Sequence, residues 1–580
     1  MDIFNVLTLI GGLCLFLFGM SVMGDALERR AGSSLKNLLG RLTKNKLTGF
    51  LTGLAVTAVI QSSSATTVMV VGFVNSGIMT LRQSIGVIMG ANIGTTVTAW
   101  VLSLGGISSD NIFMQLLKPT SFTPVLALIG TALLMFGKTS KKKDTGTILL
   151  GFATLMFGMD TMSDAVSGLK DIPAFQNMFL MFKNPVLGVL VGAILTAIIQ
   201  SSSASVGILQ ALSATGQISY GAAIPIIMGQ NIGTCITAIL SSFGTNKNAK
   251  RAAIVHLAFN VVGTIIWLGV FSIISYTLKP ALFDASATYF GIAVAHSIFN
   301  IACTTLLLPA SALLEKLAIK LVPDTKNKEK IAELDERLLA TPPVAVERCA
   351  SLVREMAEFS VTAFKESINM IEKYDASKAE EIRQAEDKAD HYEDILGTYL
   401  VKLSGHQISD SDSSMVSKLL KLIGDFERIS DHSVNVLESA EELTEKGIAF
   451  TDNAKKEMDT LCSAVSEILS LSYQAYVNND LESARRVEPL EQVIDGLKKK
   501  LRNGHIIRLK NGECSIEAGF VWADLITNLE RTADHCSNIA VCVLDAVENN
   551  MNLHESLRAR KEGNPYFDEK FKEYAMKYPV

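Results

Sequence analysis

Two short polar runs, both reading QSSS, stand at the ends of apolar stretches with no turn residue beside them. Their side chains, together with the ends of broken helices, offer hydroxyl, amide and carbonyl oxygens, which are hard ligands suited to a cation such as sodium. Free N–H groups at helix N-termini attract anions. We therefore expect a binding site that contains Gln61, Ser62, Ser63, Ser64, Gln200, Ser201, Ser202 and Ser203.

A second repeated segment follows each run at the same distance, MGANIGT at 89–95 and MGQNIGT at 228–234. A single QSSS run is equally well explained by helix packing, because small and hydroxyl residues are common at transmembrane helix contacts. The duplication of both segments favours binding over packing. The amide and hydroxyl groups that would complete such a site are those of Asn92, Thr95, Asn231 and Thr234.

Carboxylates are absent from both polar runs. A proton-coupled carrier usually needs a titratable group inside the membrane, so their absence favours sodium coupling. The acidic residues of the first 312 positions fall at or near the ends of predicted helices. We expect Asp25 and Asp164 to be helix caps or salt-bridge partners.

Two histidines are exceptions to this lack of titratable groups. The segments HLAFN and HSIFN place His and Asn four residues apart, on one face of a helix. These side chains are either polar contacts between helices or part of a transport pathway. The pathway candidates are His256, Asn260, His296 and Asn300.

Acidic pairs four residues apart recur at four places in the last third of the chain. Two like charges one helical turn apart repel each other by a few tenths of a kcal/mol. Facing helices that carry such pairs could together hold a multivalent cation, with His432 or His535 nearby; the alternative is a solvated acidic face. The predicted metal ligands are Glu386, Asp390, Glu427, Asp431, Glu491, Asp495, Glu530 and Asp534.

The elements that must position these residues are themselves repeated. FGMSVMGDA at 18–26 matches FGMDTMSDA at 157–165, and the two QSSS runs and the two NIGT segments have the same separation of 139 residues. Apolar stretches at 4–24, 83–104, 121–137, 147–167, 222–243, 252–276 and 288–312 are mostly near the roughly 20 residues that a membrane-spanning helix needs. Two copies of one unit therefore make up the membrane part.

The distribution of basic residues predicts the topology. Lysine and arginine cluster at 29–46, 138–143 and 247–251 and beyond residue 316, and the positive-inside rule makes these segments cytoplasmic. All of them face inward only if residues 47–77 enter and leave on the same side as a re-entrant pair of short helices. Each repeat then has three spans, the second repeat is inverted, and the two QSSS tips can meet near the midplane.

Charge divides the chain into two parts. Up to Pro323 there are 20 Lys and Arg against 10 Asp and Glu, and beyond it 33 against 48. The second part has amphipathic helices and repeats GDFERISDHSVN (424–435) as TNLERTADHCSN (527–538), which predicts two three-helix bundles. The expected fold class is all-α throughout. The domains are membrane repeats at 1–140 and 141–315, the latter with additional C-terminal helices, a linker at 316–344, a soluble domain at 345–550 and a tail at 551–580.

The paired QSSS runs, the NIGT segments and the two H-x-x-F-N segments resemble the sodium/phosphate cotransporter family over about residues 1–312. This resemblance implies sodium-coupled movement of inorganic phosphate, with the QSSS hairpins as the site. Residues 345–550 resemble the PhoU family, which implies regulation of phosphate uptake and E(D)xxxD metal clusters. The ligands implied are sodium ions and, in the PhoU-like domain, a divalent or ferric metal.

We therefore expect a sodium/phosphate symporter, not an enzyme, that crosses the cell membrane several times and has a cytoplasmic C-terminal domain. Eight cysteines without a C-x-x-C pair fit a reducing compartment. Two alternatives stay open: a phosphate exporter or channel gated by the PhoU-like domain, and a metal-dependent phosphohydrolase on a membrane anchor. The partners are phosphate, sodium and lipid, with no nucleic acid, and a homo-oligomer is left open.

Overall fold

The computed structural model describes residues 3–40, 46–107, 118–167, 184–323, 334–406, 408–548 and 565–579. The chain forms two compact units: Met1–Ala345 with Ile408–Asp410, and Val346–Gln407 with Ser411–Val580. Within the described residues the secondary structure is helical, with no strand beyond an isolated bridge between Ser219 and Ser286. The predicted all-α fold class is confirmed.

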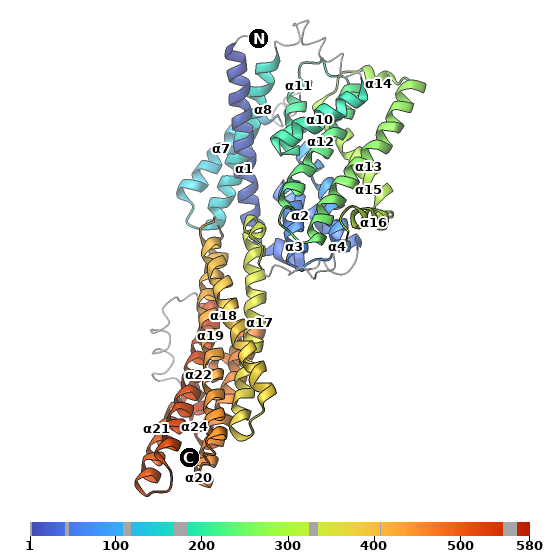
Figure 1. Cartoon of the computed structure of the whole chain (residues 1–580). Coiled ribbons are helices and arrows are strands. Elements are labelled where there is room, and N and C mark those ends of the chain that lie inside the picture. Colours follow the sequence, from blue (N-terminus) through green and yellow to red (C-terminus); the bar gives the residue numbers. More distant parts are fainter. Residues whose placement is uncertain are drawn as a thin grey trace. The chain divides into compact units, whose positions relative to one another are not determined.

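The helices of the first unit are coloured from blue to green in Figure 1. They are α1 (Ile3–Gly40), α2 (Lys46–Ile60), α3 (Ser63–Asn75), α4 (Leu81–Gly94), α5 (Thr96–Ser103), α7 (Pro119–Phe136), α8 (Ser140–Ser167), α10 (Pro185–Ile199), α11 (Ser202–Ser213), α12 (Tyr220–Ser241), α13 (Lys247–Thr277), α14 (Ala281–Asp284), α15 (Tyr289–Leu307) and α16 (Ser311–Leu321). Short 3₁₀ turns lie at η1 (Leu104–Gly106) and η3 (Glu336–Ala340).

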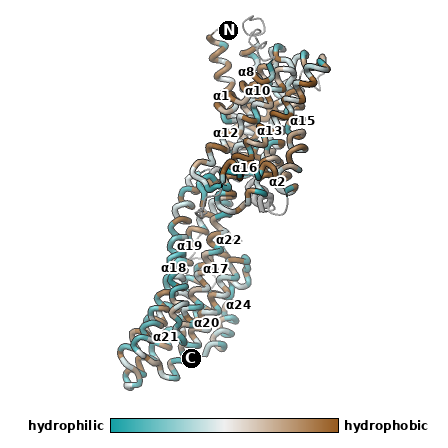
Figure 2. Tube along the Cα trace, turned by 45° about the vertical axis from the view of Figure 1, so that its right-hand side comes forward, coloured by the Kyte–Doolittle hydropathy of each residue, from teal (hydrophilic) through white to brown (hydrophobic). Residues whose placement is uncertain are grey.

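Six helical segments of the described residues are long and apolar enough to cross a membrane. They are Ile3–Arg30, Leu81–Gly106, Pro119–Phe136, Tyr220–Ser241, Lys247–Thr277 and Tyr289–Leu307. Figure 2 shows much apolar brown along helices of this unit such as α1, α13 and α15, and more hydrophilic teal in the second unit. Six of the seven predicted apolar stretches overlap these segments. The seventh lies in α8, which is 28 residues long.

Two helix pairs are broken where the polar runs occur. The breaks separate α2 from α3 and α10 from α11, and the four helices are only 12 to 15 residues long. At 1.5 Å per residue each is about 20 Å long, which is less than the roughly 30 Å of the hydrocarbon core. None of the four is therefore long enough to cross a membrane alone.

Glycines bring the helices of each repeat into close contact. A Cβ atom on Gly53 of α2 would lie 2.0 Å from the carbonyl oxygen of Val87 of α4, and one on Gly192 of α10 would lie 2.1 Å from that of Ile226 of α12. Both residues of the second contact are 139 positions after those of the first. The α2–α4 and α10–α12 pairs are therefore packed in the same way.

Glycines also join α1 to α8, the two helices that begin the repeats. A Cβ atom on Gly12 would lie 3.0 Å from the carbonyl oxygen of Gly158, and one on Gly19 would lie 2.7 Å from that of Gly151. The earlier glycine of α1 contacts the later one of α8, so the two helices run antiparallel. A salt bridge of 3.1 Å between Arg29 and Asp144 continues this interface.

The described residues of the second unit form seven helices, the first of which begins a few residues before it. They are α17 (Pro342–Glu372), α18 (Ala376–Ser404), α19 (Asp410–Glu445), α20 (Asp452–Asn478), α21 (Leu481–Lys510), α22 (Ile516–Glu548) and α24 (Pro565–Lys577). Their apolar faces are buried, as at Leu396, Phe426 and Leu525. The predicted tail contains α24, which packs against α21, where Arg486 donates to Tyr574 at 3.0 Å.

Candidate functional site

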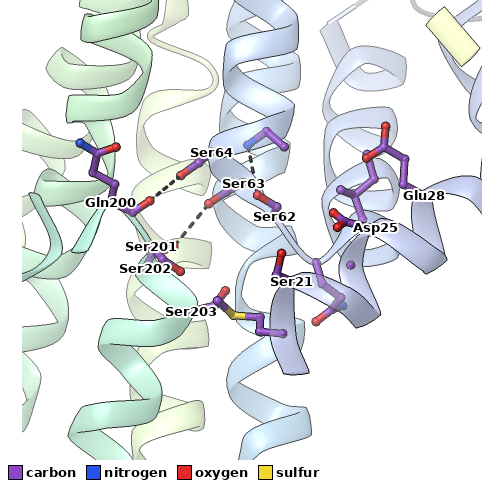
Figure 3. A pocket seen from close by; sticks show the side chains of 15 residues that line it. Ser21, Asp25, Glu28, Ser62, Ser63, Ser64, Gln200, Ser201, Ser202 and Ser203 are labelled. Atoms are coloured by element: carbon purple, nitrogen blue, oxygen red, sulfur yellow. Dashed lines mark hydrogen bonds between the residues drawn. The ribbon is translucent and has the colours of Figure 1, made fainter. Parts of the chain in front are cut away.

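The polar tips of the two broken helix pairs meet. Ser63 Oγ lies 3.4 Å from Ser202 Oγ, and Ser64 Oγ donates a long hydrogen bond of 3.5 Å to the carbonyl oxygen of Gln200. Figure 3 marks both contacts with dashed lines. Ser63 and Ser202 are buried, with 3% and 6% of their surface exposed. The structure thus brings together the two runs that the sequence selected, although 139 residues separate the two serines.

The two tips are built in the same way. Gln61 and Gln200 precede the serines with left-handed φ angles of 60° and 59°, a conformation that costs a non-glycine residue about 1 kcal/mol. Ser62 and Ser201 then cap α3 and α11, each accepting a hydrogen bond from the backbone N–H three residues later, at 3.1 and 3.2 Å. The first N–H groups of both helices therefore lie at the tips, where they favour a bound anion.

A cavity of about 300 Å³ lies at these tips. All eight residues of the two QSSS runs line it, together with Ile60 and Ala65. The remaining lining comes from α1 and consists of Met20, Ser21, Gly24, Asp25 and Glu28. Figure 3 shows the serines of both tips on one side and the two carboxylates of α1 on the other. No lysine or arginine is among the lining residues.

Asp25 and Glu28 are the site residues that the sequence analysis did not select. The sequence analysis expected Asp25 to be a helix cap or a salt-bridge partner. It is not a cap, because α1 continues to Gly40. Glu28 Oε1 is buried without a hydrogen-bond partner among the described residues. Ser21, Asp25 and Glu28 follow one another by four and three residues, which places them on one helix face. That spacing shows in the sequence that they share a face, but not that this face meets the tips.

The four residues of the NIGT segments do not line the cavity. Asn92 donates from Nδ2 to Asn260 Oδ1 at 3.3 Å, which links α4 to α13. Thr95, Asn231 and Thr234 donate to carbonyl oxygens of their own helices at 2.9 to 3.0 Å. All four are buried. The structure therefore places them in the surrounding helices, not at the tips, and their role as ligands stays a prediction.

The two histidines are buried in α13 and α15 and do not line the cavity. Asn260 and Asn300 donate to the carbonyl oxygens of His256 and His296 in the preceding turn, both at 3.0 Å. Neither ring nitrogen of His256 has a partner in the part of the chain that the structure describes. The bond from Asn92 to Asn260 fits the polar-contact interpretation, and the pathway role stays a prediction.

The acidic pairs of α18 and α19 influence one another. Burial raises the pKa of Glu386, and the charges of Asp390 and Asp431 raise it further. Burial also raises the pKa of Glu427; Arg428 opposes that shift, and Asp431 and Asp390 add to it. Carboxylates from the two helices therefore repel one another, as expected if the pairs face each other.

The pairs of α21 and α22 are partly neutralised by lysines. Lys498 Nζ lies 2.6 Å from Glu530, and Lys499 Nζ lies 2.8 Å from Asp495. Burial, followed by the charge of Glu530, raises the pKa of Asp534.

The predicted metal clusters are not assembled in this structure. His432 and His535 contact Asn528 at 3.0 Å and Asp425 at 2.9 Å. Among the described residues no three His, Cys, Asp or Glu side chains are grouped so that they could hold a metal. The metal and its ligands stay a prediction, and we derive no step from one.

Two family models match the chain. The Na+/Pi-cotransporter model matches residues 15–164 and 172–295, and the PhoU domain model matches residues 353–440 and 458–543. The protein YqeW of Bacillus subtilis is 30% identical over 311 residues, which are 53% of this chain and 95% of YqeW. The chain belongs to the Na+/Pi-cotransporter family. It carries a PhoU domain in its C-terminal part, as the sequence predicted.

Other relatives cover one or both parts of this chain. YjbB of Escherichia coli K12, named as a candidate inorganic phosphate export protein, is 24% identical over 93% of this chain and 98% of its own length. The human sodium-dependent phosphate transport protein 2B is 23% identical over 51% of this chain and 63% of its own. The crystal structure of PhoU from Pseudomonas aeruginosa is 21% identical, covers 37% of this chain and 98% of PhoU, and has a TM-score of 0.30.

The Na+/Pi-cotransporter model matches the part of the chain that forms the cavity. Both QSSS tips lie inside the residues that the cotransporter model matches. Together with the six long apolar segments, they make the first unit the multi-pass membrane part of a phosphate transporter. The second unit is its PhoU domain.

Proposed function

We propose that this chain is a sodium/phosphate symporter of the cell membrane whose cytoplasmic PhoU domain regulates transport. The observation that carries the proposal is the meeting of Ser63 and Ser202 beside a cavity of about 300 Å³. Two helix N-termini at this point suit an anion, and the hydroxyl and carbonyl oxygens suit sodium. Phosphate and sodium would therefore share one site between the tips.

The charge of the cavity supports coupling to a cation. Asp25 and Glu28 line it, and no lysine or arginine does. A phosphate dianion that entered this cavity alone would be repelled by ionised carboxylates. Sodium bound between the carboxylates and the tips removes that repulsion, so phosphate binding would depend on sodium.

We also propose that the two repeats are inverted, related by a two-fold axis in the membrane plane. Gly12 and Gly19 correspond to Gly151 and Gly158 at the repeat distance, and each contact between α1 and α8 has its reciprocal: Gly12 with Gly158 and Gly19 with Gly151. Reciprocal contacts of this kind are the mark of a two-fold axis. The contact of Ser63 with its own repeat partner, Ser202, fits a position on that axis. Movement of one repeat against the other would then expose the site to each side in turn.

The name of YjbB favours a second candidate, phosphate export. A symporter can run in either direction, because the gradients of its substrates decide the sign of net movement. A channel gated by the PhoU domain would instead conduct phosphate without sodium. The phosphohydrolase alternative would need a metal held by the acidic pairs; among the described residues no three such side chains are grouped for this.

Flux in proteoliposomes tests the proposal. The full-length chain is reconstituted, and labelled phosphate is followed with an inward sodium gradient, an outward sodium gradient or potassium alone. The symporter proposal predicts accumulation above equilibrium with the inward gradient and net loss with the outward one. Equal flux in sodium and potassium would refute coupling, and flux only down the phosphate gradient would identify a channel.

A further inference from the structure

The stretch between the membrane unit and the PhoU domain is docked on the membrane unit. We call residues Asp335–Leu339 the docked segment. Asp335 is 3% exposed, and Leu338 and Leu339 are 0% and 8% exposed. The sequence predicted a linker at 316–344. The described part of it is folded: α16 extends to Leu321 and η3 begins at Glu336.

One side of the docked segment contacts the C-terminal end of α3. Asn75, the last residue of α3, donates from Nδ2 to Asp335 Oδ2 at 2.7 Å. Leu338 packs over Gly72, where an added Cβ atom would lie 3.0 Å from Leu338 Cδ2. The glycine permits this close approach, because a side chain at position 72 would require the leucine to shift.

The other side contacts the end of α12 and the loop that follows it. Arg337 donates to the carbonyl oxygens of Ser241 at 2.5 Å and Phe243 at 2.8 Å. A cation at this place satisfies the free carbonyl groups at a helix C-terminus. Asp335 Oδ2 forms an ion pair with Nη1 of the same guanidinium at 3.0 Å. Through this ion pair the docked segment joins α3 to α12.

The N-terminal end of a third helix, α13, completes the junction. Asn246, the N-cap of α13, donates its backbone N–H to Asn75 Oδ1 and its side-chain amide to the carbonyl oxygen of Asn75, both at 2.8 Å. Asn75 is therefore bonded to the docked segment and to α13 at once. Its position fixes where the C-terminal end of α3 lies.

The opposite end of α3 is the candidate site. α3 has 13 residues and begins at Ser63, so it is a rod of about 20 Å between the docked segment and the contact with Ser202. α17, which continues into the PhoU domain, begins at Pro342, directly after η3 and Thr341. Chain continuity thus links the PhoU domain, the docked segment and one tip of the site.

We propose that the docked segment is a coupling clamp through which the PhoU domain positions α3 and so controls the transport site. Asp335 and Arg337 are positioning residues that act through Asn75. A buried ion pair adds less net stability than apolar packing of the same size, so it suits a contact that can break and re-form. The clamp rests on the proposed function where it is tested by phosphate uptake. Its test by hydrogen exchange does not depend on that function.

The structural readout is hydrogen exchange of the full-length chain, followed by mass spectrometry on peptides that cover residues 62–76. Asp335→Ala, Arg337→Ala and Asn75→Ala should each speed exchange there about tenfold, as loss of one charged hydrogen bond would. The double variant Asn75→Asp with Asp335→Asn reverses the bond between these two residues but removes the ion pair with Arg337, so its exchange should be no faster than that of Arg337→Ala. The control is Glu336→Gln, which changes an exposed charge in the same segment.

The transport readout is the rate of phosphate uptake by the same variants in proteoliposomes. The clamp predicts a changed kcat with an unchanged KM for phosphate in the three alanine variants, and in the double variant values like those of Arg337→Ala. A short glycine insertion between Thr341 and Pro342 should change kcat equally but leave exchange at 62–76 slow. This insertion keeps the docked contacts and loosens only the connection to α17.

The outcomes separate the two proposals. Wild-type exchange at 62–76 in all three alanine variants would overturn the clamp, as would faster exchange with unchanged kcat. Faster exchange throughout the chain would show general destabilisation and would also overturn it. If the wild-type protein moves no phosphate, the proposed function fails, and the exchange result alone decides whether the docked segment positions α3.

Discussion

At the scale of single residues, the candidate site combines two kinds of group that the sequence keeps far apart. The serines of the tips are neutral and belong to a duplicated motif, whereas Asp25 and Glu28 come from α1 and line the same cavity. The repeat partner of Asp25 is Asp164, but the partner of Glu28 is Ser167. The two repeats are therefore chemically different where α1 faces the cavity.

A substitution of Asp25 tests whether the carboxylates of α1 contribute to sodium binding. Asp25→Asn removes one negative charge from the cavity, so sodium should bind more weakly there. We expect the sodium concentration for half-maximal phosphate uptake to rise about tenfold, which corresponds to ~1.4 kcal/mol. The measurement is uptake in proteoliposomes over a series of sodium concentrations at saturating phosphate.

The matched control is Asp284→Asn, which removes an exposed carboxylate at the end of α14, outside the cavity. It should leave the sodium dependence unchanged. An unchanged sodium dependence in Asp25→Asn as well would show that the carboxylates of α1 do not bind the coupling ion.

The sequence could select the serines but not these carboxylates. Duplication at a fixed distance identified both QSSS runs without knowledge of the fold. Asp25 follows an apolar run that seemed to end near residue 24, and the charged continuation of α1 to Gly40 has no apolar pattern to reveal it. Which face of α1 meets the tips depends on packing against other helices, which one sequence does not contain.

At the scale of elements, glycines set the distance between the helices that carry the tips. A Cβ atom at Gly90 of α4 would lie 2.0 Å from the carbonyl oxygen of Phe50, and one at Gly229 of α12 would lie 2.0 Å from that of Val189. No flexible side chain can yield at these contacts, because both partners are backbone atoms. The α2–α4 and α10–α12 pairs would have to separate.

Alanine substitutions test this packing. Gly90→Ala and Gly229→Ala should each destabilise the protein by about 1–3 kcal/mol, the usual cost of overpacking. Gly269→Ala in α13 is the control, because an added Cβ atom there has no neighbour within 4 Å. It should be neutral or stabilising, since alanine favours a helix more than glycine does. Unfolding temperature in detergent is the measurement; equal values for all three variants would contradict the packing described here.

The elements were predictable where a pattern repeats. The breaks between α2 and α3 and between α10 and α11 follow from polar runs inside apolar ones, and amphipathic spacing predicted the helices of the PhoU domain. The docking of residues 335–339 was not predictable. It depends on Asn75 and Gly72, about 260 positions earlier, and the charged composition of the segment indicated only a linker.

At the scale of the whole molecule, the acidic pairs make the stability of the PhoU domain depend on pH. Burial, with the neighbouring acids, raises the pKa of Glu386 and Glu427 above their usual value of 4.5. As pH rises past 4.5 the unfolded chain ionises first, so the free energy of unfolding falls until pH exceeds the raised pKa values. The pairs therefore oppose folding near neutral pH.

Glutamine substitutions test this pH dependence. Glu386→Gln and Glu427→Gln should raise the unfolding temperature near neutral pH and have little effect below pH 4.5. Glu355→Gln should do the opposite. Burial alone would raise the pKa of Glu355, but the hydrogen bond and charge of Lys388, with Tyr392 and Arg348, together lower it. The measurement is the unfolding temperature of the full-length chain across this pH range. A higher stability of the wild type than of Glu386→Gln at neutral pH would contradict the repulsion between these acids.

The most direct test of the central claim is equilibrium binding of labelled phosphate to the purified full-length protein in sodium and in potassium. We predict binding by the wild type in sodium only, and its loss in both Ser63→Leu and Ser202→Leu, because each leucine fills the contact between the tips. Thr305→Leu, on an exposed face of α15, should bind like the wild type. Equal phosphate binding in potassium, or retained binding in both serine variants, would contradict a shared sodium and phosphate site between the two tips.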